Sequence, residues 1–287
     1  MEKLVIFVHI PKTAGTTMRL VIQQNYSEKN IYHHHSQISS EVAQQVFSSQ
    51  HNFQIIKGNL GFGFHELLPP LSPNDFTYIT MLRDPIQRTI SHYYYYQQES
   101  PISTPEYPLD WDEFCGRVAN NLMTRFLSGL EFYYERVFGC YFNLHLAKVK
   151  EDKRLGGYYH YSPEQMLALA KRNLTEYFRF FGITEKFEAS MLLLKKTLGW
   201  KKMYFTPMNK GEKKPLDFDL SPTTLAIINR YNELDIELYQ YAQVLFEQRI
   251  SEQGDDLDQE LQKFQAKNQR YSLLVNSQQV QEMFNKR

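Results

Sequence analysis

The chain has 287 residues, enough to bury the core of one large domain or two small ones. Its 32 basic and 32 acidic side chains balance, which argues against nucleic acid or an anionic membrane as a partner. No stretch approaches the ~20 apolar residues of a membrane span, and the N-terminus does not resemble a secretory leader. We therefore expect a cytoplasmic protein whose two cysteines, Cys115 and Cys140, are free thiols.

Short apolar runs, rich in β-branched and aromatic residues, alternate with helix-like patterns. Continuous apolar character over so few residues is typical of strands that are buried on both faces of a parallel sheet. We expect strands at 4–10, 53–57, 76–82 and 179–183. We expect helices at 17–24, 85–98, 163–177 and 185–198, with further helical patterns around 111–130. The alternation predicts an α/β fold with a P-loop-type central parallel sheet flanked by helices.

The C-terminal part of the sequence predicts a helical extension of that fold. At Ser221-Pro222 an N-cap residue precedes a proline, which predicts a long helix from there to about residue 250. From residue 251 the composition becomes rich in Gln and poor in apolar residues. We therefore divide the chain into a domain at 1–250 and a polar tail at 251–287, which is either a peripheral helix or partly disordered.

The stretch FVHIPKTAGTTMRLVI, at residues 7–22, joins an apolar run to a helical pattern. Backbone N–H groups at such a turn bind phosphate well, and Gly15 allows the backbone to approach closely. Lys12 adds a positive charge, and Thr16 and Thr17 add hydroxyl donors. The order differs from the nucleotide-triphosphatase loop, in which lysine follows glycine. Taken alone, the stretch is equally compatible with an ordinary turn that carries a surface lysine.

A second stretch, TMLRDPIQRTISHYYYY, begins on the expected strand at 76–82. Arg83 lies at the carboxyl end of that strand, where α/β sheets bind ligands, and Ser91 follows about two turns into the next helix. The two side chains can close on one anionic group, the arginine as a bidentate fork and the serine as a hydroxyl donor. The alternative is that Asp84 caps the helix while Arg83 makes a structural ion pair.

Together these stretches resemble the two cofactor motifs of sulfotransferases that use 3′-phosphoadenosine 5′-phosphosulfate (PAPS). HIPKTAGTT is similar to the loop for the 5′-phosphosulfate, and LRDPIQRTISHYYY is similar to the motif for the 3′-phosphate. The resemblance is to carbohydrate sulfotransferases, which include the heparan sulfate 2-O- and 6-O-enzymes and their shorter bacterial relatives. It extends over about residues 3–250 through KGNLGFGFHELL, NNLMTRFLSG, FFGITEKFEASMLLL, NKGEKKP and NELDIELYQYA.

The resemblance implies how the chain would hold PAPS. Lys12 and the N–H groups of residues 13–17 would bind the 5′-phosphosulfate, and Arg83 and Ser91 would bind the 3′-phosphate. A late basic loop would cover the cofactor, with a solvated run of charges as the alternative. The candidate cofactor-binding residues are Lys12, Thr13, Ala14, Gly15, Thr16, Thr17, Arg83, Ser91, Lys210, Lys213 and Lys214.

The implied reaction is in-line sulfuryl transfer to a hydroxyl of a carbohydrate or glycoconjugate, without a metal ion. Charge spreads over oxygens in such a transfer, so positioning and electrostatics dominate. Lys12 is expected to steady the charge on the leaving phosphate, while a general base takes the proton of the hydroxyl. Many relatives carry that base in a Gly-His pair, but here the pair is Gly58-Asn59, and an amide is no base.

His65 is the first candidate for the replacement base, with Glu66 and His9 in reserve. Relatives often have a histidine at the position of His65, where its role is either catalytic or structural. His9 ends the first expected strand beside the phosphate loop, although a histidine there more often packs or hydrogen-bonds locally. We expect Lys12 and His65 to be the catalytic residues.

Asn59, Asn121 and Arg125 are the candidates for binding the acceptor. Asn121 and Arg125 stand one helical turn apart, so they either reach the acceptor channel together or form a pair on a helix surface. The run of three histidines at 33–35 invites a metal interpretation. Consecutive residues do not point at one centre, and no nearby acid or cysteine completes a ligand set, so we expect a polar loop and no metal.

Two other functions are compatible with parts of the sequence. Asn59 in place of a histidine is compatible with a protein of the same fold that binds PAPS without turnover. A P-loop kinase or nucleotide triphosphatase is disfavoured by the order of the loop and by the lack of an acid for Mg²⁺. The segments 33–51, 99–110 and 142–161 are expected to shape the acceptor pocket, and a homo-oligomer is compatible with the sequence.

Overall fold

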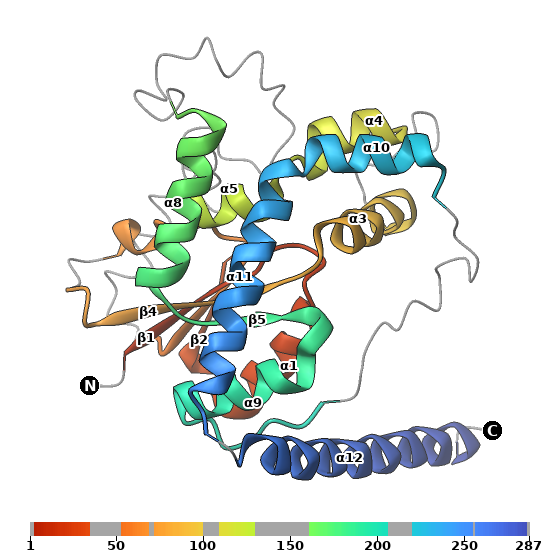
Figure 1. Cartoon of the computed structure of the whole chain (residues 1–287). Helices are drawn as coiled ribbons and strands as arrows, with labels where there is room; N and C mark the ends of the chain where they lie inside the picture. The colour runs from red at the N-terminus through yellow and green to blue at the C-terminus, as the bar shows by residue number, and fades with distance from the viewer. Residues whose placement is uncertain are drawn as a thin grey trace.

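The computed structural model describes residues 3–34, 53–68, 72–99, 109–129, 161–205, 220–254 and 256–285, with side chains of the last helix described as far as residue 275. A parallel sheet of five strands forms its centre (Figure 1). Every neighbouring pair of strands runs in the same direction, which confirms the predicted α/β fold. The spatial order is β2-β3-β1-β4-β5, with β1 (Leu4–Val8), β2 (Ile31–His34), β3 (Ile55–Gly58), β4 (Phe76–Leu82) and β5 (Phe178–Ile183).

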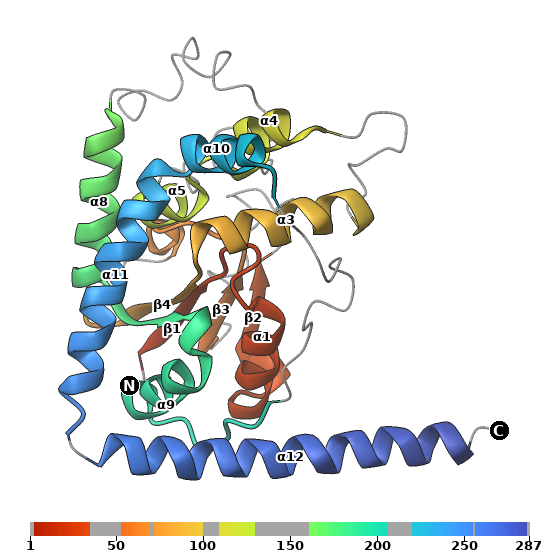
Figure 2. The same cartoon turned by 45° about the vertical axis from the view of Figure 1, so that its right-hand side comes forward.

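Helices cover both faces of the sheet. Figure 2 shows α1 (Gly15–Asn25) and α9 (Phe187–Leu198) on one side, with α8 (Pro163–Glu176) and α11 (Glu233–Ser251) on the other. The helix α5 (Leu122–Ser128) packs against both α8 and α11. Near the carboxyl ends of the strands lie α3 (Pro85–Glu99), α4 (Trp111–Phe114) and α10 (Pro222–Tyr231).

The sheet is the core of the molecule because its strands are apolar on both faces. All seven residues of β4 are buried, as are the last four of β1. Val8 of β1 pairs with Gly58 on one side and with Thr80 on the other. The chain segments that leave these three strands therefore emerge side by side at the carboxyl edge, where α/β sheets bind ligands.

Three elements differ from the sequence-based expectation. The expected polar loop around the histidines contains a strand, since His33 and His34 pair with Lys57 and Gly58 in β2 and β3. The helical patterns expected around 111–130 are α4 and α5, and the π-helical turn at Cys115–Ala119 between them was not expected. The expected helix from 222 to 250 is broken at Asn232, whose backbone leaves the helical region with φ −124° and ψ 21°.

The helix α12 (Leu257–Asn285) lies across the end of the molecule opposite to α3 (Figure 1). Its first half packs against α9, and Phe264 is buried there. The Asn268 side chain accepts a hydrogen bond from the backbone N–H of Phe205, in the segment after α9. Part of the expected polar tail is thus a docked helix.

No helix in the described part of the chain is long and apolar enough to cross a membrane. Cys115 is a buried free thiol, and Cys140 lies outside the described residues.

Candidate active site

The loop between β1 and α1 has an unusual backbone. Lys12 and Ala14 have positive φ angles, 69° and 65°, which non-glycine residues rarely adopt. Alternating left-handed and right-handed residues turn successive N–H groups toward one point, which is a common way to bind an anion. The Thr13 hydroxyl donates a hydrogen bond to the Ile10 carbonyl at 2.8 Å and is fully buried. Thr13 therefore holds the loop in shape, while the neighbouring residues are open to the cavity.

Gly15 is needed for a reason that the sequence does not reveal. A Cβ at this position would lie 1.8 Å from Cε1 of His9, so the histidine ring occupies the space that a side chain would fill. The His9 ring also stacks on Phe7, at 5.8 Å between ring centres, and its backbone N–H donates to the Gly58 carbonyl. Burial is the main cause that lowers the pKa of His9 to about 4, and the charge of Lys12 adds to it. His9 is therefore neutral near pH 7.

The stretch that begins at Arg83 contacts the loop that contains Lys12. Arg83 donates from Nη1 to the Lys12 carbonyl at 3.1 Å, and its Nε lies 3.9 Å from Oε1 of Glu185. The Asp84 carboxylate accepts from the N–H of Gln87 at the start of α3. Both features of the structural alternative, a helix cap and an ion pair, are thus present. They leave the Arg83 side chain in the wall of a cavity rather than on an open surface.

Lys12 reaches toward α3 across this cavity. Its Nζ lies 4.3 Å from the centre of the Tyr95 ring, a cation–π contact that positions the ammonium group. Tyr95 lies four residues after Ser91, one helical turn along α3, and both side chains line the cavity. Its spacing from Ser91 singles out Tyr95 among the four tyrosines at 93–96 of this helix.

These groups enclose a cavity of about 380 Å³, within the usual range of small-molecule sites. It contains two cations, Lys12 and Arg83, and no carboxylate is among its described lining residues. The N-terminus of α1 contributes further positive potential. The cavity is therefore suited to an anionic ligand. Its lining residues are His9, Pro11, Lys12, Ala14, Gly15, Thr16, Thr17, Asn59, Arg83, Ser91, Tyr95 and Thr184.

The two positions discussed for the base lie in different places. Asn59 lines the cavity beside the loop. His65 lies elsewhere: its Nδ1 is 2.8 Å from the Tyr78 hydroxyl, and its ring stacks on Phe76 at 4.5 Å. Phe76 pairs with Leu4, at the start of both strands, whereas the cavity lies at their carboxyl ends. Because burial also lowers the pKa of His65, the geometry favours a structural role for this residue.

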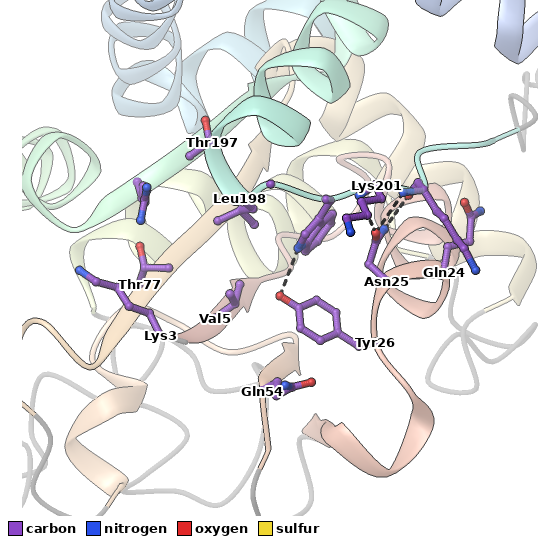
Figure 3. A pocket seen from close by; sticks show the side chains of 14 residues that line it. Lys3, Val5, Gln24, Asn25, Tyr26, Gln54, Thr77, Thr197, Leu198 and Lys201 are labelled. Carbon is purple, nitrogen blue, oxygen red and sulfur yellow. Dashed lines mark hydrogen bonds between the residues drawn. The ribbon is translucent and has the colours of Figure 1, made fainter. Parts of the chain in front are cut away.

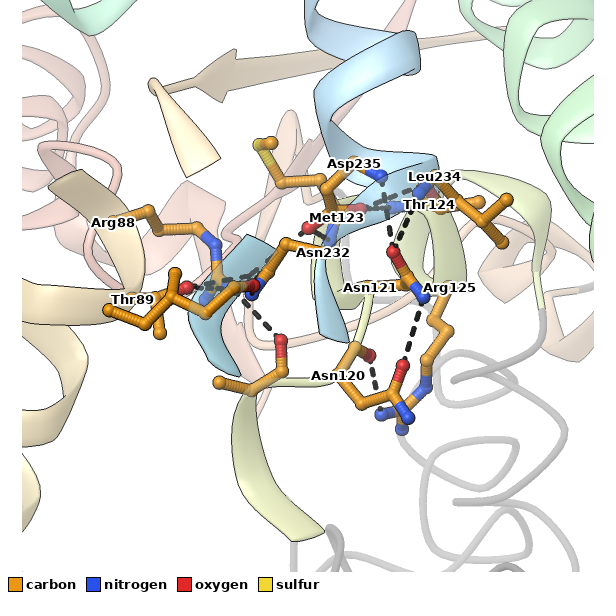
Figure 4. Close-up of polar contacts among 12 residues, drawn as sticks. Arg88, Thr89, Asn120, Asn121, Met123, Thr124, Arg125, Asn232, Leu234 and Asp235 are labelled. Carbon is orange, nitrogen blue, oxygen red and sulfur yellow. Dashed lines mark hydrogen bonds and ion pairs between the residues drawn. The ribbon is translucent and has the colours of Figure 1, made fainter. Parts of the chain in front are cut away.

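Asn121 belongs to a capping arrangement between two helices (Figure 4). Its side-chain oxygen accepts from the N–H groups of Leu234 and Asp235 at the start of α11. In return, the Asp235 carboxylate accepts from the N–H groups of Met123 and Thr124 at the start of α5, at 3.0 and 2.7 Å. Each helix thus satisfies the free N–H groups of the other. Asn121 is not among the described residues that line the cavity.

Arg125 and Arg88 lie beside these caps. Arg125 is only 5% exposed, and its Nη1 donates to the Asn120 carbonyl, so it is neither a surface residue nor part of the described cavity lining. Arg88 is fully buried, with Nη2 at 3.2 Å from Oδ1 of Asn232 and 3.9 Å from Oδ2 of Asp235. Because Arg88 is on α3, the network fixes the helix that carries Ser91 (Figure 4).

A larger cavity of about 740 Å³ lies at the opposite edge of the sheet (Figure 3). The C-terminal ends of α1 and α9 form its walls, and the Asn25 side chain bonds the backbone of Lys201 and Lys202 across it. Its lining has the cations Lys3, Arg179, Lys201 and Lys202, but it borders helix C-termini, which carry partial negative charge. The smaller cavity, with half the volume, borders the N-terminus of α1 and the loop with positive φ angles, so we take it as the candidate nucleotide site.

The remaining expectations concern the late lysines and a metal ion. Lys210, Lys213 and Lys214 lie outside the described residues. Among the part of the chain that the structure describes, no group of three or more His, Cys, Asp or Glu side chains is placed to hold a metal.

Comparison with known protein families gives a match over almost the whole chain. The model of the galactose-3-O-sulfotransferase family matches residues 2–282, almost the whole chain. The chain belongs to this family of carbohydrate sulfotransferases. The resemblance that the two motifs indicated is thereby confirmed.

Individual relatives point to the same class of enzyme. Heparan-sulfate 6-O-sulfotransferase 1 of Cricetulus griseus is 30% identical over 204 residues, which cover 62% of this chain and 46% of that protein. The Gallus gallus protein of the same name is 26% identical over 287 residues, covering 84% and 65%. Heparan-sulfate 6-O-sulfotransferase 2 of Danio rerio is 24% identical over 295 residues, covering 87% and 59%. The chain spans about half the length of the first of these relatives.

Proposed function

We propose that the chain transfers the sulfuryl group of PAPS to a hydroxyl of a carbohydrate or glycoconjugate. The observation that carries this proposal is the cavity in which Lys12, the N-terminus of α1, Arg83 and Ser91 converge. PAPS has phosphate at both its 3′ and 5′ positions, and the cavity offers two separate sets of anion-binding groups. Membership of a carbohydrate sulfotransferase family supports the acceptor class.

The described residues fit the donor. We assign the 5′-phosphosulfate to the N–H groups of the β1–α1 loop and to Lys12, and the 3′-phosphate to Arg83 and Ser91. The contact of Lys12 with Tyr95 keeps the ammonium group in place before the ligand arrives, so little reorganisation is needed as charge grows on the leaving phosphate. Arg83 is held by the Lys12 carbonyl and by Glu185, which ties the two anion sites together. Asn59 is left as a polar contact for the acceptor or donor rather than a base.

Calorimetric titration with 3′-phosphoadenosine 5′-phosphate, the desulfated product, tests the donor half. We expect binding to the wild-type chain and at least a tenfold loss of affinity, roughly, in Lys12→Ala and in Arg83→Ala, because each removes a hydrogen-bonding charge from an anion site. Lys29, an exposed residue outside the cavity, provides the matched control, and Lys29→Met should bind as the wild type does. Lack of binding by the wild-type chain would contradict the proposal.

Transfer itself is measured with ³⁵S-labelled PAPS and a panel of acceptors. Desulfated heparan sulfate oligosaccharides and galactose-terminated oligosaccharides are included because the relatives and the family carry these names. The second candidate function, PAPS binding without turnover, is favoured by Asn59 in the cavity where relatives carry the base. Binding of the product nucleotide with no labelled acceptor in the whole panel would support that second function.

A further inference from the structure

A second cavity, of about 250 Å³, opens on the other side of the β1–α1 loop. It shares His9, Gly15 and Thr16 with the donor cavity, so the two cavities adjoin at the loop and the His9 ring. The donor cavity extends from Asn59, after β3, to Thr184, after β5, whereas this one extends from β1 to β3 and β2. Its lining residues are Phe7, His9, Gly15, Thr16, Arg19, His33, His34, Lys57 and Gly58.

Lys57 is the notable side chain of this second cavity. It is on β3, between Phe7 of β1 and His33 of β2, and only 6% of the residue is exposed. None of the described residues gives its buried Nζ a hydrogen-bond partner. A buried amine without a partner is costly, and such a group in a cavity beside an anion site indicates a role with a ligand.

The charged and titratable groups around Lys57 come from three elements. Arg19 is on α1, Glu28 precedes β2, and His33 and His34 are on β2. Glu28 is engaged by His33, with Oε1 and Nε2 2.7 Å apart. Burial lowers the pKa of Lys57 to about 8; Glu28 opposes this effect and Arg19 adds to it. A substantial fraction of the amine is therefore neutral at a slightly alkaline pH.

We propose that this second cavity receives the acceptor hydroxyl and that the neutral Lys57 amine is the general base. This assignment rests on the proposed function. The Nζ lone pair takes the hydroxyl proton as the acceptor oxygen forms its bond to sulfur. The bond between sulfur and the 5′-phosphate oxygen breaks with its electron pair on that oxygen, and Lys57 is left as an ammonium ion. In-line transfer requires attacking and leaving oxygens on opposite sides of sulfur, so the sulfuryl group would lie at the border that the two cavities share, with the acceptor oxygen entering from the side of Lys57.

The geometry favours Lys57 over the other titratable candidates. Asn59 has no basic form, and His65 lies at the opposite edge of the sheet. His9 borders both cavities, but its ring fills the space against Gly15 and its low pKa makes it a weak base. We assign His9 to the shared border of the two cavities, where it is in contact with both.

Three variants separate a base from a positive charge. Lys57→Met should bind the product nucleotide with the affinity of the wild-type chain, within about twofold, while kcat falls by about 10²–10⁴. Lys57→Arg should be equally slow, because arginine keeps its charge and cannot accept a proton. Lys29→Met, in the exposed turn before β2, is the control and should keep the full rate. The wild-type kcat/KM should rise with pH toward a plateau above about pH 8, and this rise should be absent from both Lys57 variants.

Each outcome of these assays decides one of the two assignments. Transfer at the wild-type rate in Lys57→Arg, or an unchanged pH profile in Lys57→Met, overturns the role of Lys57 alone. Absence of nucleotide binding and transfer in the wild-type chain overturns the proposed function, and this assignment with it.

A measurement without an acceptor tests the amine directly. In protein produced with lysine labelled with ¹³C at the ε carbon, the resonance that is missing in Lys57→Met should titrate with a pKa far below those of the other lysines. It should also shift when 3′-phosphoadenosine 5′-phosphate is added. Titration of this resonance together with the exposed lysines overturns the assignment.

Discussion

At the scale of single residues, Gly15 and His9 show how two side chains share one space. The absence of a Cβ at Gly15 admits the His9 ring, and the ring in turn borders both the donor cavity and the cavity of Lys57. We predict that Gly15→Ala lowers the affinity for 3′-phosphoadenosine 5′-phosphate by at least tenfold, roughly, because the new methyl group displaces the ring or the loop. Calorimetric titration measures this loss.

A double variant checks the cause of that loss. Replacing His9 by alanine removes the atoms with which the new methyl group collides, so Gly15→Ala should be tolerated better in that background. If the two changes are strictly additive in binding free energy, the steric explanation is wrong.

His92, on α3, links the protonation of one residue to the stability of the fold. Burial first, and then the charges of Arg88 and Lys12, lower the pKa of His92 to about 3 from its ordinary value of 6.5. The unfolded chain therefore binds one more proton at this site between pH 6.5 and 3. The contribution of neutral His92 to the free energy of unfolding is fully present above pH 6.5. It declines as the pH falls from 6.5 to 3, by up to about 1.4 kcal/mol per pH unit.

We predict that His92→Gln makes the free energy of unfolding less sensitive to pH between 6.5 and 5. Urea denaturation at several pH values in this range measures the slope for both chains. An identical slope in the two chains would show that His92 is protonated in the folded protein.

At the scale of elements, the caps between α5 and α11 make one carboxylate serve two purposes. Asp235 accepts from the N-terminus of α5 and lies against the buried guanidinium of Arg88. Asp235→Ala leaves that charge and two N–H groups uncompensated, so we predict a loss of about 3–5 kcal/mol in unfolding free energy.

The control for this prediction is another pairing of an aspartate with an arginine. Asp112 pairs with Arg230 on the surface, where both side chains are more than half exposed. Asp112→Ala should cost less than about 1 kcal/mol. Chemical denaturation of both variants measures their losses of unfolding free energy. Similar losses would mean that the buried network stabilises the fold no more than an exposed ion pair does.

The sequence revealed those elements whose signal is local. The run of aromatic and β-branched residues in β4 predicts a buried strand with the bounds that the structure has, and Pro85 marks the start of α3. The strand β2 was missed because two of its four residues are histidines, and it forms through pairing with β3. The helix break at Asn232 was missed for a similar reason, since a contact with Arg88, 144 residues away, stabilises it.

The same distinction applies to the candidate site. Lys12, Arg83 and Ser91 were predicted together from the resemblance of their two stretches to the cofactor motifs of sulfotransferases, and the carboxyl ends of β1 and β4 bring them to one cavity. Asn121 and Arg125 were interpreted as acceptor-facing from their spacing, which does not show that Asn121 caps a helix more than a hundred residues away. Lys57 carries no sequence signal, because only the pairing of three strands shows that its amine is buried.

At the scale of the whole molecule, α12 closes the end of the fold that is farthest from the donor cavity. Phe264 joins the main core, and Asn268 bonds the backbone of the segment after α9. We predict that truncation after Gly254 lowers the unfolding free energy by about 3 kcal/mol, the sum of one exposed aromatic side chain and one lost buried hydrogen bond. Nucleotide affinity should stay within about twofold of the full chain, since the donor cavity is at the other edge.

Thermal denaturation and calorimetric titration of the truncated chain measure the two effects separately. Loss of nucleotide affinity without loss of stability would show that the C-terminal helix acts on the donor cavity.

The mutual caps also bear on the order in which the chain acquires its structure during translation. Met123 and Asp235 are 112 residues apart, so α5 emerges from the ribosome long before the residue that caps it. Arg88, on the helix that carries Ser91, likewise waits for Asn232 and Asp235. The donor loop and its strand are synthesised before α11, yet the opposite wall becomes fixed only when α11 has been made. The nascent chain therefore has no rigid nucleotide site until α11 has emerged.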